Sequence, residues 1–274
     1  MSIKVKTLSS ALGAEIVGVN PCEPLDGVII KTIRDAWLDH GVVFIRGYHV
    51  TDAEHAAFCA NFGKIQAERT APESESDDQP GMLFVSNFKE NAILPDGEMW
   101  FHSDQCYFDL PVSATSLYAI ESPLKGGHTL FSDCYEAYKT LPDEIKNKLY
   151  GRVAMNVYDY QSNNRYVKST QRKKGAPSAV HPVIRTHPET GRKALFLNRL
   201  MTDYILGMDI LESTKLLEYL FDHIEQKQFI YEHIWLPGDL SIWDNRCTLH
   251  ARTDFDSSER RLLRRYALEG DKPV

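Results

Sequence analysis

The sequence has few cysteines and no arrangement that would pair them. The five cysteines, an odd number, are scattered along the 274 residues, and no two of them form a Cys-x-x-Cys pair. Disulfide frameworks of small secreted proteins use even numbers of cysteines, and structural zinc sites use closely spaced pairs. Both are therefore disfavoured, and we expect reduced thiols in a cytoplasmic protein.

Long apolar runs and excess positive charge are also missing. The first ten residues, MSIKVKTLSS, contain no apolar stretch of signal-peptide length, and no run elsewhere is long enough to span a bilayer. The net charge of −7 argues against a general affinity for nucleic acid or for acidic membrane surfaces. No Gly-x-Gly-x-x-Gly follows a strand and no Walker loop is present, which disfavours the nucleotide-binding folds.

The composition that remains is that of an ordinary soluble globular protein, with 43% hydrophobic and 25% charged residues. The chain has no internal repeat and no low-complexity linker, so we expect a single domain over residues 1–274. An acidic stretch, APESESDDQPG, is too poor in apolar residues to pack. A basic stretch, VKSTQRKKGAPSA, is likewise poor in apolar residues. They predict flexible loops at 66–82 and 165–180 that act as flaps over one mouth.

Helix and strand signals alternate at first, and strands dominate later. Apolar residues at helical spacing predict helices at 25–41, 51–63, 134–151 and 210–226. Asp26 and Gly41 are the expected ends of the first helix, and Thr51 with Glu54 has capping-box spacing. Residues typical of β-structure predict strands at 14–19, 42–47, 82–88, 115–121, 129–133, 181–187, 193–198, 228–235, 239–245 and 262–270. This order predicts a mainly β fold with flanking helices, a sandwich or jelly roll.

The segment MWFHSDQCY, residues 99–107, places His102 and Asp104 two positions apart. In a strand, such residues point to the same face and would offer a nitrogen and an oxygen ligand to one metal. Roughly one such pair is expected by chance in a chain of this composition, so the motif alone is weak. Two similar pairs, beginning at His187 and His223, fall in a predicted turn and a predicted helix, where this spacing does not bring ligands together. A hydrogen-bonded histidine near the core remains the plain alternative for His102.

The far end of the chain supplies what a metal site would still need. LSIWDNRCTLHARTDFDSSERRLLRRYAL, residues 240–268, reads as a strand, a turn with Trp243 and Asn245, and then His250, with Arg261 and Arg265 after it. Two histidines and one carboxylate with open positions suit non-haem Fe(II) and oxygen chemistry. An arginine nearby can hold a distant carboxylate with two hydrogen bonds. A solvated basic face is the other interpretation of ERRLLRR.

These segments resemble the taurine dioxygenase family of Fe(II)- and 2-oxoglutarate-dependent oxygenases. The likeness covers nearly the whole chain, through LGAEIVGVN, HGVVFIRG, WFHSD, GGHTLF, HPVIRTHPETGRKALFLN, IWDNRCTLHA and ERRLLRRYALEGDKP. It implies a double-stranded β-helix, which is the jelly-roll or cupin-like fold. It also implies that His102, Asp104 and His250 are the catalytic iron ligands. Relatives are often dimers or tetramers, so a homo-oligomer is implied as well.

The resemblance assigns further residues to the cosubstrate. 2-Oxoglutarate would chelate Fe(II) through its keto oxygen and C1 carboxylate, while Thr129 and Arg261 hold the remote carboxylate and Trp243 lies beside it. With O₂ these components would hydroxylate the substrate and release succinate and CO₂. A solvent-facing strand threonine and a core tryptophan are the plain alternatives for Thr129 and Trp243.

The resemblance places the primary substrate near Arg265, which would bind an anionic group, with Glu68, Gln105 and Met201 at further substrate positions. Taurine itself is not expected: Glu68 and Ala71 replace a histidine and a tyrosine of taurine-specific relatives, Glu98 replaces an asparagine, and Met201 replaces an aromatic residue. The glutamates could bind an ammonium group or be solvated loop residues. Cys106 shares strand parity with His102 and Asp104, and no role is assigned to it.

Three classes of function follow. The first is a 2-oxoglutarate-dependent dioxygenase that hydroxylates a small organic acid. The second is a cupin-like hydrolase or isomerase that uses the same metal ligands without 2-oxoglutarate, and the third is a non-catalytic binding protein with this fold. Arg261 and Thr129 favour the first class, because the other two need no anchor for 2-oxoglutarate.

Overall fold

The computed structural model describes residues 3–66, 81–93, 97–158, 160–161, 164–168 and 175–274. Glu68, Ala71 and most of the first predicted flap, 66–82, lie outside these residues, as does 169–174 of the second, so the flap prediction stays a prediction for those parts. The two ends of the second predicted loop, 165–180, are strands instead: β10, Asn164–Lys168, and β11, Ser178–Pro182. No helix of the described part is long and apolar enough to cross a membrane.

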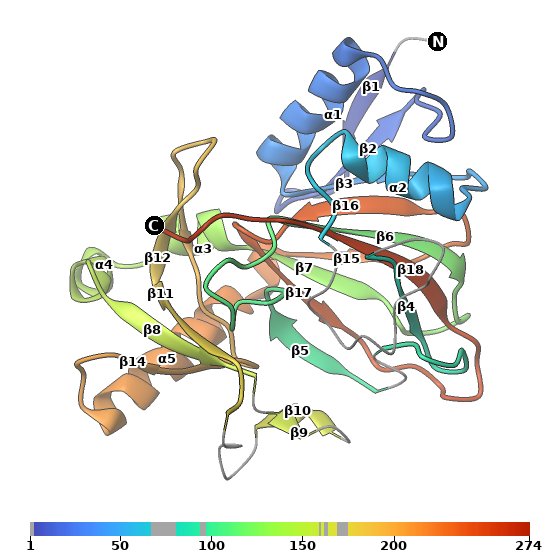
Figure 1. Ribbon diagram of the computed structural model, residues 1–274. Helices are drawn as coiled ribbons and strands as arrows, with labels where there is room; N and C mark the ends of the chain where they lie inside the picture. Colours follow the sequence, from blue (N-terminus) through green and yellow to red (C-terminus); the bar gives the residue numbers. More distant parts are fainter. Residues whose placement is uncertain (1–2, 67–80, 94–96, 159, 162–163, 169–174) are drawn as a thin grey trace.

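Two β-sheets that face each other form the centre of the molecule (Figure 1). The larger has seven strands in the order β1-β2-β3-β16-β6-β18-β4, and the smaller has four in the order β15-β7-β17-β5. Among these strands only β2 and β3 pair in parallel. The bounds are β1 Lys4–Thr7, β2 Ala14–Val17, β3 Val42–Ile45, β4 Leu83–Ser86, β5 Met99–His102, β6 Ala114–Glu121, β7 Thr129–Asp133, β15 Ile230–His233, β16 Leu240–Asp244, β17 Thr248–Arg252 and β18 Leu262–Leu268.

Successive side chains of each strand point to opposite faces of the large sheet, so the two faces pack against different parts of the molecule. On one face, Phe44, Leu117 and Trp243 pack against Phe131 of the small sheet, and this contact forms the core between the sheets. The two facing sheets with helices outside confirm the predicted jelly roll.

The opposite face of the large sheet is covered by α1, Gly27–His40, and α2, Asp52–Ala60 (Figure 1). Both predicted helix starts are confirmed: Asp26 accepts a hydrogen bond from the Ile29 amide, and Thr51 and Glu54 form the capping box. These caps satisfy backbone amides that have no partner within the first turn.

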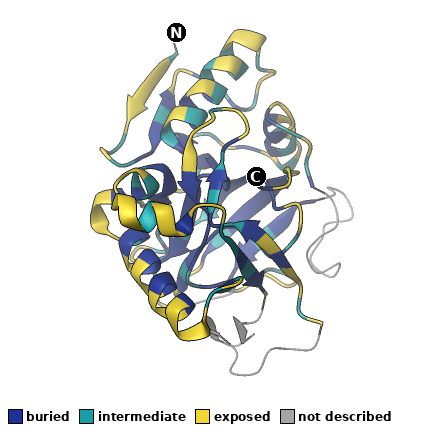
Figure 2. Cartoon of the chain, turned by 90° about the vertical axis from the view of Figure 1, so that its left-hand side faces the viewer, coloured by how far each residue is buried: buried dark blue, intermediate teal, exposed yellow. Residues whose placement is uncertain are grey.

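The outer face of the small sheet carries the second core of the molecule. Leu249 of β17 packs there with helices α3, Cys134–Lys139, α4, Asp143–Leu149, and α5, Ile210–Ile224. The helices that face the viewer in Figure 2 bury one side and expose the other. The single helix predicted at 134–151 is wrong: it breaks at Leu141, because the residue before a proline avoids the helical conformation and Pro142 lacks an amide hydrogen.

Short strands complete this side of the molecule. They are β8 Val153–Val157, β9 Tyr160–Gln161, β10 Asn164–Lys168, β11 Ser178–Pro182, β12 Ile184–Thr186, β13 Lys193–Leu195 and β14 Thr202–Ile205, with a 3₁₀ turn, η2, at Lys227–Phe229. The one strand predicted at 181–187 is in fact two strands, because β11 pairs with β8 whereas β12 pairs with β13.

Gly41 ends α1 with φ at 71° and lies against β17, which carries His250. A Cβ there would come within 2.8 Å of Thr248 Cγ2, whereas Gly47, at φ 80°, has nothing within 4 Å of the same position. An L side chain in this conformation costs about 1–2 kcal/mol at either site. Crowding adds about 1–3 kcal/mol at Gly41 only.

Gly41→Ala should therefore lower the free energy of unfolding more than Gly47→Ala does. Urea denaturation of both variants measures the difference. Equal losses would mean that the contact with Thr248 relaxes without cost.

Candidate metal centre

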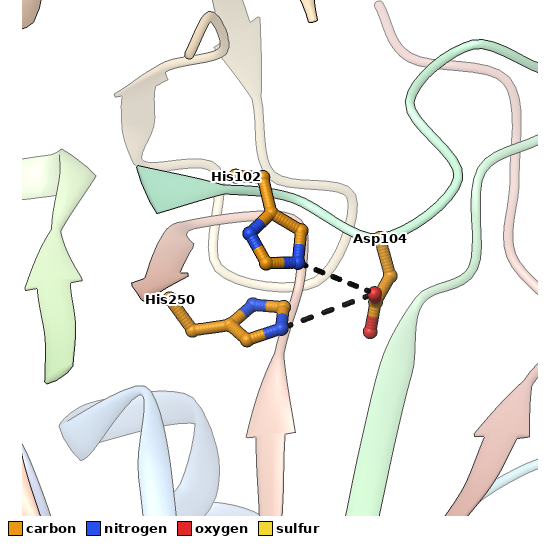
Figure 3. A group of neighbouring side chains, drawn as sticks. All are labelled: His102, Asp104 and His250. Atoms are coloured by element: carbon orange, nitrogen blue, oxygen red, sulfur yellow. Dashed lines mark ion pairs between the residues drawn. The ribbon is translucent and has the colours of Figure 1, made fainter. Parts of the chain in front are cut away.

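Two histidines from paired strands lie side by side (Figure 3). His102, the last residue of β5, is directly opposite His250 of β17 in the strand register. Opposed residues of an antiparallel pair have neighbouring side chains, and the two imidazole ring centres are 4.1 Å apart. The register of one strand pair therefore brings together two residues that are far apart in the sequence.

Asp104 completes the group, although not in the way the sequence predicted. Strand β5 ends at His102, and Asp104 lies in the turn that follows, so the two-residue strand spacing is not what aligns them. The turn places Asp104 Oδ1 3.9 Å from Nε2 of both histidines. Two ligand atoms that lie roughly 2.0–2.2 Å from one metal are about 3–4 Å apart. The three side chains thus face a common point that suits a metal ion.

The charges of the three side chains fit metal binding. The Nδ1 atom of His102 lies 2.8 Å from the Trp100 carbonyl, which can only accept, so Nδ1 carries the hydrogen and Nε2 is free to bind. Burial lowers the pKa of His102, and burial together with His102 lowers that of His250 to about 3. Burial would raise the pKa of Asp104, but Arg265 and the histidines hold it well below its usual range. Two neutral imidazoles and one carboxylate result at neutral pH.

The second oxygen of Asp104 is already engaged. The Thr115 hydroxyl donates to Oδ2 at 2.6 Å, and Arg265 Nη2 lies 3.0 Å from the same atom. Oδ1 is consequently the oxygen that points to both histidines.

A cavity between the two sheets is lined by this group and also by Thr129, Arg261 and Arg265. Arg265 contacts Asp104, whereas Arg261 lies four residues earlier on the extended segment that leads into β18, which places it roughly 13 Å farther along the cavity. The Thr129 hydroxyl accepts a hydrogen bond from Trp235 Nε1 at 2.9 Å, and the residue is buried, so the solvent-facing alternative is wrong. Arg261 is 3% exposed and donates from Nε to the Gly127 carbonyl at 3.3 Å. Its Nη1 atom is buried without a hydrogen-bond partner among the described residues, and no described carboxylate pairs with the guanidinium.

The charge of Arg261 is costly where it lies. Burial, and then the neighbouring Arg252, lowers the pKa of Arg261 well below its ordinary value. A buried cation is normally paired, because removing it from water costs several kcal/mol. The cavity therefore offers an anion-binding end opposite the candidate metal ligands.

Trp243 forms part of the cavity wall. It is buried in β16, not in the turn that the sequence indicated, and its ring centre lies 4.7 Å from that of His250. It is both a core aromatic residue and a neighbour of the site.

The four arginines of ERRLLRR separate by strand alternation. Arg261 and Arg265 line the cavity, whereas Arg264 points to the opposite face and binds Asp52 and the His55 ring. Arg260 is exposed and pairs with Glu121 at 2.8 Å. A solvated basic face is therefore wrong for all but Arg260.

Only some of the residues predicted to bind the primary substrate lie near the candidate metal ligands. Gln105 is buried in the turn after Asp104 with φ at 56°, and its Oε1 has no partner among the described residues. Met201 is buried, with its sulfur 3.4 Å from that of Cys106. Glu98 is exposed, and Glu68 lies outside the described residues.

Cys106 also lies in this turn, so the strand-parity argument fails for it as it does for Asp104. Its thiol accepts a hydrogen bond from Asn198 at 3.4 Å, and burial raises its pKa to about 12. The thiol is therefore protonated at neutral pH.

A second group, His187 with Asp244 and Cys247, has metal-like spacing. Arg246 binds both oxygens of Asp244, at 2.8 and 2.7 Å, and His187 Nε2 lies 3.0 Å from Oδ2. This carboxylate is already neutralised by a guanidinium, so the group stabilises the turn after β16 and does not suit a metal ion.

Sequence reasoning missed Thr115, Asn245 and Arg252 as neighbours of the site. Thr115 and Asn245 hydrogen-bond around Asp104, and Arg252 lines the cavity while donating to the Gly97 carbonyl. Alternation from Leu117 would have indicated that Thr115 faces inward. Alternation from His250 would likewise have indicated Arg252, which lies two residues later in the same strand. No sequence signal indicated that Asn245 reaches the site.

Known proteins resemble this chain over its whole length. Residues 4–266 match the family described as taurine catabolism dioxygenase TauD, TfdA family. An (S)-phenoxypropionate/alpha-ketoglutarate-dioxygenase of Sphingobium herbicidovorans is 30% identical over 97% of this chain and 95% of its own length. An alpha-ketoglutarate-dependent sulfate ester dioxygenase of Pseudomonas putida is 30% identical over 100% of this chain and 92% of its own.

A solved structure agrees in fold. That of AAD-2 in complex with Mn(II) and N-oxalylglycine superimposes with a TM-score of 0.83 at 29% identity, covering 100% of this chain and 99% of that one. The family match over residues 4–266 and the shared jelly roll lead to one conclusion. This chain belongs to the TauD/TfdA dioxygenase family.

Proposed function

We propose that this chain is an Fe(II)- and 2-oxoglutarate-dependent dioxygenase that hydroxylates a small organic acid other than taurine and releases succinate and CO₂. One observation carries the proposal: a cavity is lined by three metal-ligand side chains and, away from them, by the buried Arg261, which has no carboxylate partner among the described residues. A dicarboxylate that chelates a metal at one end needs this arrangement. The names of the two relatives support it, as does the complex of AAD-2 with N-oxalylglycine, which has a carboxylate at each end.

The donor set fits Fe(II). Two neutral imidazoles and one carboxylate hold a divalent ion and leave positions open for other ligands. When bound there, Fe(II) supplies the activation of O₂ that couples decarboxylation of 2-oxoglutarate to oxidation of the substrate.

The protein's own groups bind and orient the cosubstrate. Arg261 can give two parallel hydrogen bonds to the remote carboxylate. Thr129 accepts from Trp235, so its own hydroxyl hydrogen remains to be donated to the same carboxylate. The apolar walls, among them Leu117 and Trp243, exclude water and thereby strengthen both contacts.

Arg265 is the candidate contact for the acid group of the primary substrate. It gives one nitrogen to Asp104 and lines the cavity at the metal end. Phenoxypropionate and sulfate esters, for which the two relatives are named, both carry an anionic group that an arginine can bind.

The broader setting is also part of the proposal. We propose that the chain folds as a single domain, that it forms a homo-oligomer, and that it acts in the cytoplasm. Neither nucleic acid nor a membrane is proposed as a partner. All five cysteines are free, which is consistent with a reducing compartment.

The direct test is anaerobic addition of Fe(II) and 2-oxoglutarate. The chelate should give a weak charge-transfer band in the visible region that neither component gives alone. His102→Ala, Asp104→Ala and His250→Ala should each remove the band, because each deletes one ligand. His49→Ala, which removes an exposed histidine, is the control and should keep it. A normal band in His250→Ala would show that this ligand is wrongly assigned.

Arg261 and Arg265 should differ in what their loss impairs. Removing a charged partner from a buried pair costs on the order of 3–5 kcal/mol. Arg261→Ala should therefore raise the apparent KM for 2-oxoglutarate by roughly two to four powers of ten. Arg265→Ala should weaken the binding of acidic substrates most. Because Arg265 also pairs with Asp104, this variant should raise the KM for 2-oxoglutarate somewhat, but far less than Arg261→Ala does.

Arg260→Ala is the matched control, because Arg260 adjoins Arg261 in sequence but is exposed. In this variant the KM for 2-oxoglutarate and the KM for the acidic substrate should both stay within about twofold of the wild type, as expected for an exposed ion pair. Equal loss of 2-oxoglutarate binding in Arg261→Ala and Arg265→Ala would assign both arginines to the cosubstrate. No residue of this chain would then be assigned to the anionic group of an acidic primary substrate.

A further inference from the structure

Thr115 holds the oxygen of Asp104 that does not face the histidines. It lies on β6 and is fully buried, and strand alternation points it into the space between the two sheets. Its hydroxyl donates to Asp104 Oδ2 at 2.6 Å, close to the shortest distance that such bonds adopt.

The direction of this hydrogen bond is fixed by the groups behind it. Trp243 Nε1 can only donate, and it does so to Asn245 Oδ1 at 3.1 Å. The Asn245 amide is therefore oriented with Nδ2 toward Thr115, and it donates to the Thr115 oxygen at 2.9 Å. The single hydroxyl hydrogen of Thr115 is left for Asp104.

The same asparagine also holds the turn that carries Asp104. Its backbone carbonyl accepts from the Ser103 hydroxyl at 2.9 Å, and its side-chain oxygen accepts from the Asp104 amide at 3.4 Å. Asn245 is 1% exposed, so water does not compete for these bonds. The carboxylate is thus fixed both through its backbone and through Oδ2.

The consequence concerns how Asp104 binds a metal. Thr115 and Arg265 engage Oδ2, whereas Oδ1 is equally distant, at 3.9 Å, from Nε2 of both histidines. We propose that Thr115 and Asn245 are positioning residues that restrict Asp104 to one-oxygen binding. A carboxylate free to rotate would present both oxygens and fill a position that the cosubstrate needs. The inference rests on the proposed function for the identity of that cosubstrate, but not for the geometry of the carboxylate.

Thr115→Val is the test, because valine keeps the shape of threonine and removes the hydroxyl. Loss of a group that orients a metal ligand typically weakens metal binding by 10–100-fold. We expect Thr115→Val to bind Mn(II) about 10–100-fold more weakly than the wild type. With Fe(II) under anaerobic conditions, its affinity for 2-oxoglutarate should fall by a larger factor, and the visible band of the chelate should be altered. Thr115→Ser, which restores the hydroxyl, should return both affinities to within about threefold of the wild type.

Ser116→Ala is the matched control for simple loss of a buried hydroxyl. Ser116 is the next residue of β6, is equally buried, and donates to the Ser241 carbonyl at 2.6 Å on the opposite face. Its loss should lower the melting temperature without changing Mn(II) affinity or the visible band. Asn245→Ala keeps Thr115 but removes the donor that aims its hydroxyl, so it should weaken Mn(II) binding by a smaller factor. It also provides the test if Thr115→Val does not fold.

Wild-type Mn(II) affinity and an unchanged band in Thr115→Val, or in Asn245→Ala if that variant has to be used, would overturn the proposal. Equal weakening in Ser116→Ala would also overturn it, because the effect would then be general destabilisation. If the wild type binds Mn(II) but forms no chelate with 2-oxoglutarate, the proposed function fails instead. The Mn(II) affinities of the variants still decide the role of Thr115 and Asn245 in that case.

Discussion

The alternation of side chains along strands that face each other is the constraint on which the site depends. Only inward positions reach the space between the sheets, and β6, β16 and β18 send Thr115, Trp243 and Arg265 there. The neighbouring outward residues, such as Tyr118 and Tyr266, pack against α1 and α2. A one-residue slip in the register of any of these strands would move the site residues to the helical side and bury the wrong set between the sheets.

The second constraint is electrostatic. Three arginines, Arg252, Arg261 and Arg265, line the cavity, and Asp104 is the carboxylate among its described lining residues. Arg265 is paired with Asp104, whereas Arg261 is buried without a described carboxylate partner. Such a group lowers the stability of the folded chain unless a ligand supplies the missing charge. A divalent metal and a dianionic cosubstrate together would offset that cost, which links binding at the two ends of the cavity.

Much of the fold was predictable because local signals agree with it. The caps at Asp26 and Thr51 and the stop at Gly41 are chemical features that the sequence states directly. Element boundaries that depend on distant partners were not predictable. The strand expected at 181–187 divides because its two halves pair with different strands, and that choice is made by tertiary packing. The break between α3 and α4 follows from a local signal, Pro142, which helical periodicity alone does not take into account.

The site was partly predictable for a similar reason. His102, Asp104 and His250 stood out through spacing and resemblance, yet the spacing argument gave the wrong local structure for Asp104, which is in a turn. The real cause of their proximity is the register of β5 against β17, which no local pattern reveals. Thr115 and Arg252 share strand parity with Leu117 and His250, but alternation gives only the face of the sheet and not the contact. Asn245 lies in a turn and carries no motif. The hydrogen bonds of the folded chain, such as that from Thr115 to Asp104, show what these residues contact.

The central claim is that one cavity binds a metal at one end and the remote carboxylate of 2-oxoglutarate at the other. A crystal structure of this protein with Mn(II) and N-oxalylglycine tests it most directly. The account predicts Mn(II) on His102 Nε2, His250 Nε2 and a single oxygen of Asp104, with the far carboxylate on Arg261 and Thr129. Metal bound at His187 and Asp244, or an analogue whose far carboxylate lies away from Arg261, would contradict the account.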